Sequence, residues 1–166
     1  LADAFTRAYE ADPISIFGGI IACNREVDKA TAEQMHDIFL EIVMAPSFTK
    51  EALDILTAKQ NIRLLEMTSI EADEKSQKIK TVKGGILVQT ADDGKVDSED
   101  LQIATTRKPT TKELEDLLFS WKAVKHVKSN AIVLAKDKQT IGIGAGQMNR
   151  IGAAKIAIEQ AGEKAT

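Results

Sequence analysis

Apolar residues recur at helical spacing in five stretches of the chain. In the first stretch, residues 1–12, the apolar positions are Leu1, Ala4, Phe5, Ala8 and Tyr9. These positions fall on one face of a helix. Pro13 ends this helix, because the residue before a proline is pushed out of the α region. The same periodicity predicts further helices over residues 31–39, 50–59, 110–127 and 148–161.

Polar residues at the edges of these stretches mark where the helices begin and end. Thr49 is placed to cap the helix that follows it, and Glu51 lies in the first turn, where a carboxylate complements the positive helix end. Thr110 and Glu113 have the spacing of a capping box. Gly162 follows the last apolar position and predicts the end of the final helix.

Short apolar runs between the helices predict strands. These runs are residues 15–24, 41–48, 61–67 and 81–97, with two more inside 130–146 that are joined at Asp137 and Lys138. Gly18 and Gly19 lie inside the first run, and paired glycines in a strand indicate close approach by a ligand or another backbone. The run 81–97 includes an Asp-Gly turn, whereas residues 71–80 are charged and predict an exposed connection. This order of elements favours a layered α/β fold in two subdomains.

The composition is that of an ordinary globular protein and disfavours several functional classes. Of the 166 residues, 43% are hydrophobic and 28% are charged, and the net charge is −3. The basic residues are spread along the chain, so no nucleic-acid surface or basic membrane patch is predicted. Only 4% of the residues are aromatic, which argues against a base-stacking platform. No apolar run reaches the length of about 18 residues that spans a membrane, and we expect a soluble, cytoplasmic protein.

The sequence is poor in groups for disulfide or metal chemistry. Cys23 is the single cysteine, so no disulfide can form within the chain. The two histidines, His36 and His126, lie far apart in the sequence. Neither has ligand spacing from Cys23 or from the other histidine. The residues therefore predict no metal site.

The segment GIGAGQMNR, residues 142–150, is the first candidate site. Gly142, Gly144 and Gly146 follow a predicted strand and precede a predicted helix, a context in which backbone N–H groups bind anions. The spacing is GxGxG, whereas a dinucleotide fingerprint needs GxGxxG, so a nicotinamide cofactor is disfavoured. A structural turn is the plainer alternative. Arg150 favours a phosphate or carboxylate ligand, because a guanidinium group binds either one through two parallel hydrogen bonds.

The segment VKHVKSN, residues 124–130, is the second candidate. Lys125 and His126 suit a general acid–base role, but basic residues at a helix end also complement the helix dipole. Asn130 follows Ser129 just before a predicted strand, where its amide can bind a planar polar ligand or stabilise a turn.

The third candidate lies around the first predicted strand. Phe17 can flank a flat ring and Gly18 can admit the edge of a ligand, although an aromatic core residue beside a bulge explains both as well. Glu41 is a candidate site acid, and a solvated surface carboxylate is the alternative. Taken alone, these residues predict a ligand-binding α/β domain without an assembled catalytic set.

Several long blocks of the sequence together resemble a known family. The blocks are YEADPISIFGGIIACNREVD, APSFTKEAL, VKGGILVQ, WKAVKHVKSNAIV and IGIGAGQMNRIGAAKIA. They follow in order over nearly the whole chain, and the similarity is weakest across residues 68–80. The chain is identified as a member of the bifunctional family that combines phosphoribosylaminoimidazolecarboxamide (AICAR) formyltransferase with inosine monophosphate (IMP) cyclohydrolase, and it resembles the transformylase domain.

The resemblance implies a reaction and an architecture. The reaction is transfer of a formyl group from 10-formyltetrahydrofolate to the amine of AICAR ribonucleotide in purine biosynthesis. The architecture is two cytidine-deaminase-like α/β units: residues 1–80 form part of the first, and residues 81–166 form a linker and part of the second. The resemblance also implies a homodimer with its sites across the interface and a structural potassium ion near residues 124–131. Transfer without a catalytic metal is implied too, in agreement with the missing HxE and PCxxC elements of zinc deaminases.

Carried over position by position, the family's substrate site falls on Phe17, Gly18, Glu41, Asn130 and Arg150. The resemblance implies that Phe17 and Gly18 lie at the AICAR base and that Glu41 binds the carboxamide. Asn130 lies at the substrate and is the catalytic candidate, whereas Arg150 reaches the nucleotide. The folate is expected near Ile14 and Ile151, and no residue is assigned to a metal.

The family also implies which groups are missing. The AICAR amine is a weak nucleophile, and the family activates it and stabilises the oxyanion with a Lys-His pair. That pair belongs to a motif absent from this sequence, and Lys125-His126 is a different dipeptide. The chain begins at Leu1 in helical sequence, so we interpret it as the central fragment of a transformylase that is inactive alone. The alternative is a non-catalytic folding or dimerisation module of that enzyme.

Overall fold

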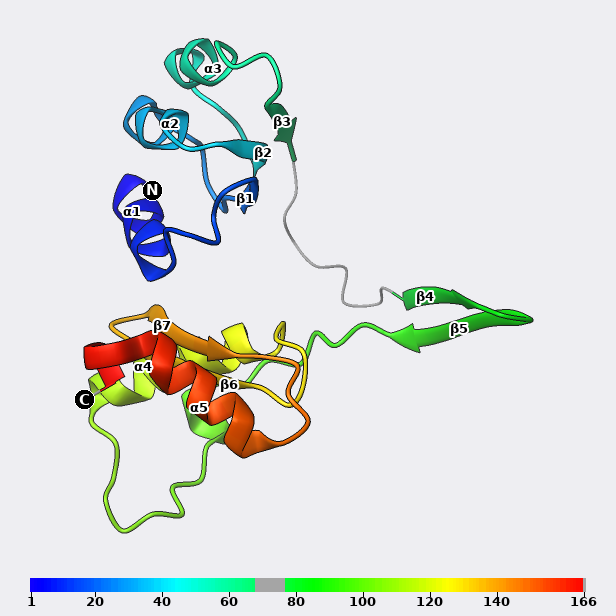
Figure 1. Ribbon diagram of the computed structural model, residues 1–166, viewed down its shortest axis with the longest axis vertical. Coiled ribbons are helices and arrows are strands. Elements are labelled where there is room, and N and C mark those ends of the chain that lie inside the picture. Colours follow the sequence, from blue (N-terminus) through cyan, green and yellow to red (C-terminus); the bar gives the residue numbers. More distant parts are fainter. Residues whose placement is uncertain (68–76, 166) are drawn as a thin grey trace.

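The computed structural model describes residues 1–67 and 77–165 (Figure 1). The elements run α1 (Ala2–Ala11), β1 (Gly19–Ala22), α2 (Lys29–His36), β2 (Leu40–Ala45), α3 (Lys50–Leu56), β3 (Arg63–Glu66), β4 (Gln77–Val82), β5 (Gly85–Thr90), α4 (Thr111–Val124), β6 (Ile132–Lys136), β7 (Gln139–Gly144) and α5 (Arg150–Ala161). Short 3-10 helices occupy Ser98–Asp100 and Gly162–Ala165. The chain is therefore a mixed α/β protein, as the sequence predicts.

The first region, residues 1–67, is a three-stranded parallel sheet in the order β1-β2-β3, with α2 and α3 packed together beside it (Figure 1). Parallel strands need crossover connections, and the two helices provide them. The core between the helices and the sheet includes Val27, Met35, Val43 and Leu56, all essentially inaccessible to solvent. Burying such side chains is the main favourable term in folding.

Side-chain caps define where these helices begin. Asp28 accepts a hydrogen bond from the Thr31 backbone N–H at 2.9 Å, and Thr49 accepts one from the Ala52 N–H at 3.2 Å. The Thr31 side chain and backbone both donate to Asp28, which lowers the pKa of that carboxyl group. The predicted cap at Thr49 is confirmed.

The second region, residues 111–161, is an antiparallel pair of strands, β6 and β7, covered by α4 and α5 (Figure 1). The predicted join at Asp137 and Lys138 is confirmed, and both residues have positive φ angles. The backbone N–H groups of Asp137 and Lys138 donate to the Asp116 carboxylate at 3.0 and 2.7 Å, which ties this turn to α4. The capping box between Thr110 and Glu113 is also confirmed.

Two of the glycines in the candidate phosphate loop serve packing. Gly142 and Gly144 lie within β7, where α5 crosses it. A Cβ atom added at Gly142 would lie 2.0 Å from the carbonyl oxygen of Ala157, and one at Gly144 would lie 1.9 Å from that of Ala153. No side chain fits at such distances, so glycine here sets how closely the helix approaches the strand. Gly142 and Gly144 therefore serve packing inside β7 and do not form the structural turn that was the plainer alternative.

Between the first and the second region in sequence, the chain forms a β hairpin that projects from the body of the molecule (Figure 1). Strands β4 and β5 pair antiparallel, and every residue of both strands is exposed. The turn lies at Lys83 and Gly84, where Gly84 has a φ of +88°.

Helix α1 of the first region and the residue that follows it contact the second region through hydrogen bonds. The Gln139 side chain at the start of β7 donates to the Arg7 carbonyl oxygen at 2.5 Å. The Gln160 side chain near the end of α5 donates to the Asp12 carboxylate at 3.4 Å. The C-terminal end of α1 therefore lies near the C-terminal end of α5, whereas Arg150 is at the opposite, N-terminal end of α5.

Several predicted boundaries were wrong. The strand predicted over 15–24 is limited to β1, because Gly18 adopts a φ of +72° and ends a turn rather than continuing a strand. The helix predicted over 31–39 begins earlier, at Lys29, because Asp28 caps it. Residues 77–80, predicted as a connection, belong to β4, while residues 71–76 lie outside the described residues. The predicted Asp-Gly turn, at Asp93, lies in an irregular segment after β5.

None of the helices within residues 1–67 and 77–165 is long and apolar enough to cross a membrane. The predicted boundary between residues 80 and 81 falls inside β4 and stays a prediction of domain organisation.

Candidate functional site

The predicted site residues, together with three of their neighbours, fall into two clusters. The first, which we call the β1–β2 cluster, consists of Ile14, Phe17, Gly18, Phe39 and Glu41, at the start of the two neighbouring strands. The second, which we call the α5 cluster, consists of Asn130, Gln147, Met148, Arg150 and Ile151, around the start of α5.

In the β1–β2 cluster, two phenyl rings form an exposed apolar face. The rings of Phe17 and Phe39 lie 5.0 Å apart between centroids at 44°, a favourable tilted geometry. The Gly18 N–H donates to the Phe39 carbonyl oxygen at 2.9 Å, which fixes Phe17 beside Phe39. Gly18 has a positive φ that L side chains rarely adopt, so the turn that carries Phe17 requires glycine. Most of the Phe17 side chain faces solvent.

The turn before Phe17 is organised by Asp12. One carboxylate oxygen of Asp12 accepts hydrogen bonds from the backbone N–H groups of Ile14 at 3.2 Å and Ser15 at 2.9 Å. The hydrogen bonds from the Ser15 side chain and backbone lower the pKa of Asp12, so this turn is stabilised by an ionised carboxylate. Ile14, at the outside of the turn, is left exposed.

Glu41 is the second residue of β2 and follows Phe39 by two residues. It is exposed at the start of β2, between the buried Leu40 and the partly buried Ile42. Alternation along a strand accounts for this: Leu40 faces the core, so Glu41 faces away from it. The structure thus places an exposed carboxylate two residues from Phe39.

In the α5 cluster, Asn130 holds the segment that leads into α5. Its side-chain amide donates to the carbonyl oxygens of Gln147 at 3.1 Å and Met148 at 3.4 Å. Its backbone N–H also donates to the Gln147 carbonyl oxygen, and its own carbonyl accepts from the Gln147 N–H at 3.2 Å. The Ser129–Asn130 peptide bond is cis. Among the described residues, the side-chain oxygen of Asn130 accepts no hydrogen bond, so it is available to a ligand.

The start of α5 presents a cation and two apolar side chains. Asn149 caps the helix by accepting a hydrogen bond from the Gly152 N–H at 2.7 Å. Arg150 is the first residue of the helix and is exposed, and Met148 and Ile151 beside it are largely exposed as well. The chain turns between the end of β7 at Gly144 and the start of α5 at Arg150, and the binding role of Arg150 stays a prediction. An exposed guanidinium beside the positive end of a helix is suited to an anionic ligand.

The structure does not bring the two clusters together within one chain. Asp12, which organises the turn at Ile14, contacts Gln160 near the far end of α5. Ten residues of helix separate Gln160 from Arg150, a rise of about 15 Å. Among residues 1–67 and 77–165, no hydrogen bond, ion pair or ring contact joins one cluster to the other.

Three residues of these clusters, Phe39, Gln147 and Met148, were not among the predicted site residues. Phe39 was assigned to the apolar face of a helix, but the helix ends at His36 and Phe39 pairs with Phe17 instead. Met148 was counted as the first helical residue, whereas α5 begins at Arg150 and leaves the Met148 side chain almost fully exposed.

The dipeptide Lys125-His126 lies at the end of α4. Lys125 forms an ion pair with Asp92 at 3.6 Å between Nζ and Oδ1, and the His126 backbone N–H donates to the Ala123 carbonyl oxygen. Neither belongs to the two clusters. The geometry agrees with the helix-end alternative.

Metal ligands do not gather in the described residues. No group of three or more His, Cys, Asp or Glu side chains that could hold a metal ion occurs within 1–67 and 77–165. In the segment expected to hold potassium, the backbone carbonyls of Val124, Lys128 and Asn130 accept backbone hydrogen bonds. The potassium ion stays a prediction.

The fold and the two clusters define a mixed α/β chain with exposed aromatic, amide and cationic side chains at its edges. The family model described as "AICARFT/IMPCHase bienzyme" matches residues 1–160. The chain is 63% identical over 164 residues to the bifunctional purine biosynthesis protein PurH of Oceanobacillus iheyensis, a match that covers 99% of this chain and 32% of that protein. It is 63% identical over 163 residues to the proteins of the same description from Bacillus thuringiensis and Bacillus cereus, covering 98% of this chain and 32% of each.

This chain belongs to the AICARFT/IMPCHase bienzyme family. It spans about a third of the length of the curated relatives that it matches.

Proposed function

We propose that this chain is the central part of an AICAR transformylase, which transfers a formyl group from 10-formyltetrahydrofolate to the amine of AICAR ribonucleotide in purine biosynthesis. The observation that carries the proposal is the family match over residues 1–160, which includes every residue of both clusters. The two sheets are proposed to be parts of two cytidine-deaminase-like units, and the protein is proposed to act in the cytoplasm.

The α5 cluster suits the nucleotide. Arg150 offers a planar, permanently charged fork at a helix start, the arrangement that binds phosphate or carboxylate. The side-chain oxygen of Asn130 is proposed to accept a hydrogen bond from the AICAR amine and so to orient its lone pair toward the formyl carbon. The two hydrogen bonds that the Asn130 amide donates to Gln147 and Met148 hold this oxygen in place.

The β1–β2 cluster suits the base and the folate. The exposed ring of Phe17 can stack on the flat imidazole, and Gly18 lets the edge of the base approach the backbone. Glu41 is proposed to accept hydrogen bonds from the carboxamide NH₂ group, which a carboxylate does well because it is an acceptor only. Ile14 on one cluster and Ile151 on the other provide the apolar contacts for the folate.

The separation of the clusters supports a site shared by two copies. One chain alone places Asn130 and Arg150 at the start of α5 and places the turn at Ile14 against the far end of that helix. In a two-fold dimer, the same two surfaces meet twice across the interface. We propose that the β1–β2 cluster of one copy faces the α5 cluster of its partner, so that each dimer holds two complete sites.

Formyl transfer also needs a base for the amine and a stabiliser for the oxyanion. Neither cluster contains a histidine or a lysine, so these two tasks are proposed to fall to a Lys-His pair outside this sequence. The chain alone is then expected to bind substrate and to give negligible formyl transfer. Turnover near that of an intact transformylase would contradict this part of the proposal.

The binding function is tested by calorimetry of the chain with AICAR ribonucleotide. Binding in the micromolar range, with one nucleotide per chain, is expected if both clusters are in use. Absent binding, or binding weaker than about 1 mM, would favour the alternative of a folding or dimerisation module.

A matched pair of variants on α5 distinguishes a specific contact of Arg150 with the nucleotide from a general effect of positive charge on this helix. Arg150→Ala is expected to weaken nucleotide binding by about 1.5–3 kcal/mol, because a charge-assisted hydrogen bond to the ligand is lost. Lys155→Ala removes another exposed cation from the same helix and is expected to leave the affinity nearly unchanged. Equal affinities for the two variants would remove Arg150 from the site.

A further inference from the structure

The side chain of Gln160 is held at both atoms of its amide group. Its Oε1 atom accepts a hydrogen bond from the Ile143 backbone N–H at 2.6 Å, and its Nε2 atom donates to the Asp12 carboxylate at 3.4 Å. Gln160 belongs to the last turn of α5, Ile143 lies in β7, and Asp12 directly follows α1. One amide group therefore joins the second region to the first.

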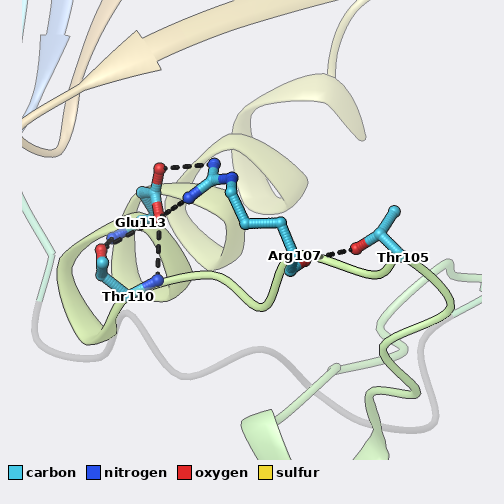
Figure 2. Close-up of polar contacts among 4 residues, drawn as sticks. All are labelled: Thr105, Arg107, Thr110 and Glu113. Atoms are coloured by element: carbon cyan, nitrogen blue, oxygen red, sulfur yellow. Dashed lines mark hydrogen bonds and ion pairs between the residues drawn. The ribbon is translucent and has the colours of Figure 1, made fainter.

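This contact differs from the polar network at the start of α4, which is local. There Arg107 donates two hydrogen bonds to the Glu113 carboxylate, at 3.1 and 2.8 Å (Figure 2). The residues labelled in Figure 2 all lie within one short segment, so this network stabilises the start of its own helix. Gln160 and Asp12 lie near opposite ends of the sequence, and their contact fixes one region relative to the other.

Asp12 divides its carboxylate oxygens between Gln160 and the turn that follows α1. The Oδ1 atom accepts hydrogen bonds from the N–H groups of Ile14 and Ser15, and the Oδ2 atom accepts the one from Gln160. An ionised carboxylate is an acceptor only and has room for all three donors. The turn leads on to Phe17, so the position of Asp12 determines where the exposed side chains of Ile14 and Phe17 lie.

A second glutamine of the second region contacts the first region at another point. Gln139, at the start of β7, donates from its side chain to the Arg7 carbonyl oxygen at 2.5 Å. Arg7 lies within α1 and is not part of the turn over residues 12–18. Both glutamines hold the same two regions together, but Gln160 bonds the carboxylate that shapes the turn. Gln139 is therefore a matched control for Gln160.

We propose that Gln160 is a positioning residue of the substrate site: through Asp12 it fixes the turn over residues 12–18 and so sets where Ile14 and Phe17 meet the ligand. Gln160 itself touches no substrate and acts through the carboxylate. The role of the turn in binding rests on the proposed function. The fixing of the turn by Gln160 is measured without any ligand, so failure of one and failure of the other are distinguishable.

A change of charge at Gln160 breaks the contact with Asp12. Gln160→Glu keeps an acceptor for the Ile143 N–H but replaces the donor to Asp12 with a carboxylate oxygen, and two carboxylates placed together repel each other. The dissociation constant for AICAR ribonucleotide is expected to rise about threefold to tenfold, and amide hydrogen exchange at Ile14 and Ser15 to become faster by a similar factor. Gln139→Glu makes the same chemical change at the other contact and is expected to leave both quantities within about twofold.

An exchange of the two polar groups provides a rescue. When Asp12→Asn is combined with Gln160→Glu, the asparagine amide donates to the new carboxylate, and the asparagine oxygen still accepts from the turn. Asp12→Asn alone sets two amide donors against each other, because the Gln160 oxygen is engaged by Ile143. That variant is expected to behave like Gln160→Glu alone. The double variant is expected to return both quantities to within about twofold of the unmodified chain, a coupling that independent structural effects do not produce.

Calorimetry with AICAR ribonucleotide and amide exchange followed by NMR compare the unmodified chain with the four variants, and thermal unfolding checks that each remains folded. The proposal is overturned if Gln160→Glu leaves exchange at Ile14 and Ser15 unchanged, if Gln139→Glu changes it equally, or if the double variant shows no rescue. An unmodified chain that binds no AICAR ribonucleotide would contradict the proposed function. Exchange rates that rise in Gln160→Glu and recover in the double variant would still support the fixing of the turn by Gln160.

Discussion

The first region of the molecule completes its own core, and the second does not. Among the residues that the structure describes, all the large buried apolar side chains lie in residues 1–67, whereas the buried apolar side chains of the second region are Ala153, Ala157 and Ala161. The second region instead leaves Leu117, Trp121, Met148 and Ile151 exposed. The contrast indicates which surfaces are finished within the described residues and which are available to a ligand or to another polypeptide.

The largest effect that separates the two regions is expected from truncating a leucine in each. Leu56 is 0% exposed, and Leu56→Ala is expected to destabilise the chain by about 2–5 kcal/mol through lost burial and the cavity left behind. Leu117 is 56% exposed, and Leu117→Ala is expected to change the free energy of unfolding by no more than about 0.5 kcal/mol. Urea unfolding at low protein concentration compares them. Similar losses for both leucines would mean that the second region has a core of its own.

A second contrast concerns how closely α5 and β7 pack. Gly144→Ala would place a methyl group on the Ala153 carbonyl, and it is expected to cost about 1–3 kcal/mol or more as the helix is displaced. Gly85→Ala is the control, since a Cβ atom there meets nothing within 4 Å. Thermal unfolding of the two variants checks the prediction. A Gly144→Ala protein as stable as the Gly85→Ala protein would show that the seam between α5 and β7 is looser than described.

The helix caps of the first region are expected to have a smaller effect. Thr49→Ala removes the acceptor for the Ala52 N–H and is expected to cost about 1 kcal/mol. Thr57→Ala is the control at the other end of α3. It removes a hydroxyl that donates to the Leu53 carbonyl oxygen, and little change in stability is expected. The denaturant midpoints of the two variants measure the difference. Equal midpoints would mean that the Thr49 cap does not stabilise the start of α3.

The smallest effect is a dependence on pH at the start of α4. Hydrogen bonds from Arg107 and Thr110 lower the pKa of Glu113 from 4.5 to about 2. A lowered carboxyl pKa contributes stability that is present above pH 4.5 and is lost as the pH falls toward 2. Glu113→Gln is expected to remove this dependence. Circular dichroism between pH 5 and 2 measures it, and an equal loss of helix signal in both proteins on acidification would assign the transition to other carboxyl groups.

The helices could be predicted from the sequence because their signals are local. Thr49, Thr110 and Gly162 each mark a helix end through their own side chain or backbone freedom, and each was found where predicted. The boundary at Asp28 was missed because this cap lies three residues before Thr31, where the predicted helix began. The β4–β5 hairpin was missed because its lysines alternate with apolar residues and were taken as part of an exposed connection.

The candidate site could be predicted only in part, because contacts between distant segments leave no local signal. Gly142 and Gly144 are two residues apart, so in a strand both face the same side. The residues that they pack against, Ala157 and Ala153, lie on α5 and outside the glycine motif, so the motif alone does not reveal the contact. The pairing of Phe17 with Phe39 depends on how β1 and β2 align, which the apolar pattern does not specify. The roles of Glu41, Asn130 and Arg150 rest on the family resemblance and stay predictions.

The most direct test of the shared site is a mixing experiment with two binding-deficient chains. Phe17→Ala damages the β1–β2 cluster and Arg150→Ala damages the α5 cluster, and each protein alone is expected to bind AICAR ribonucleotide poorly. If the site lies between copies, an equal mixture forms hybrid dimers in which one site is intact, and calorimetry is expected to recover about a quarter of the unmodified number of sites. A mixture that binds no better than either protein alone would contradict a site built from two copies.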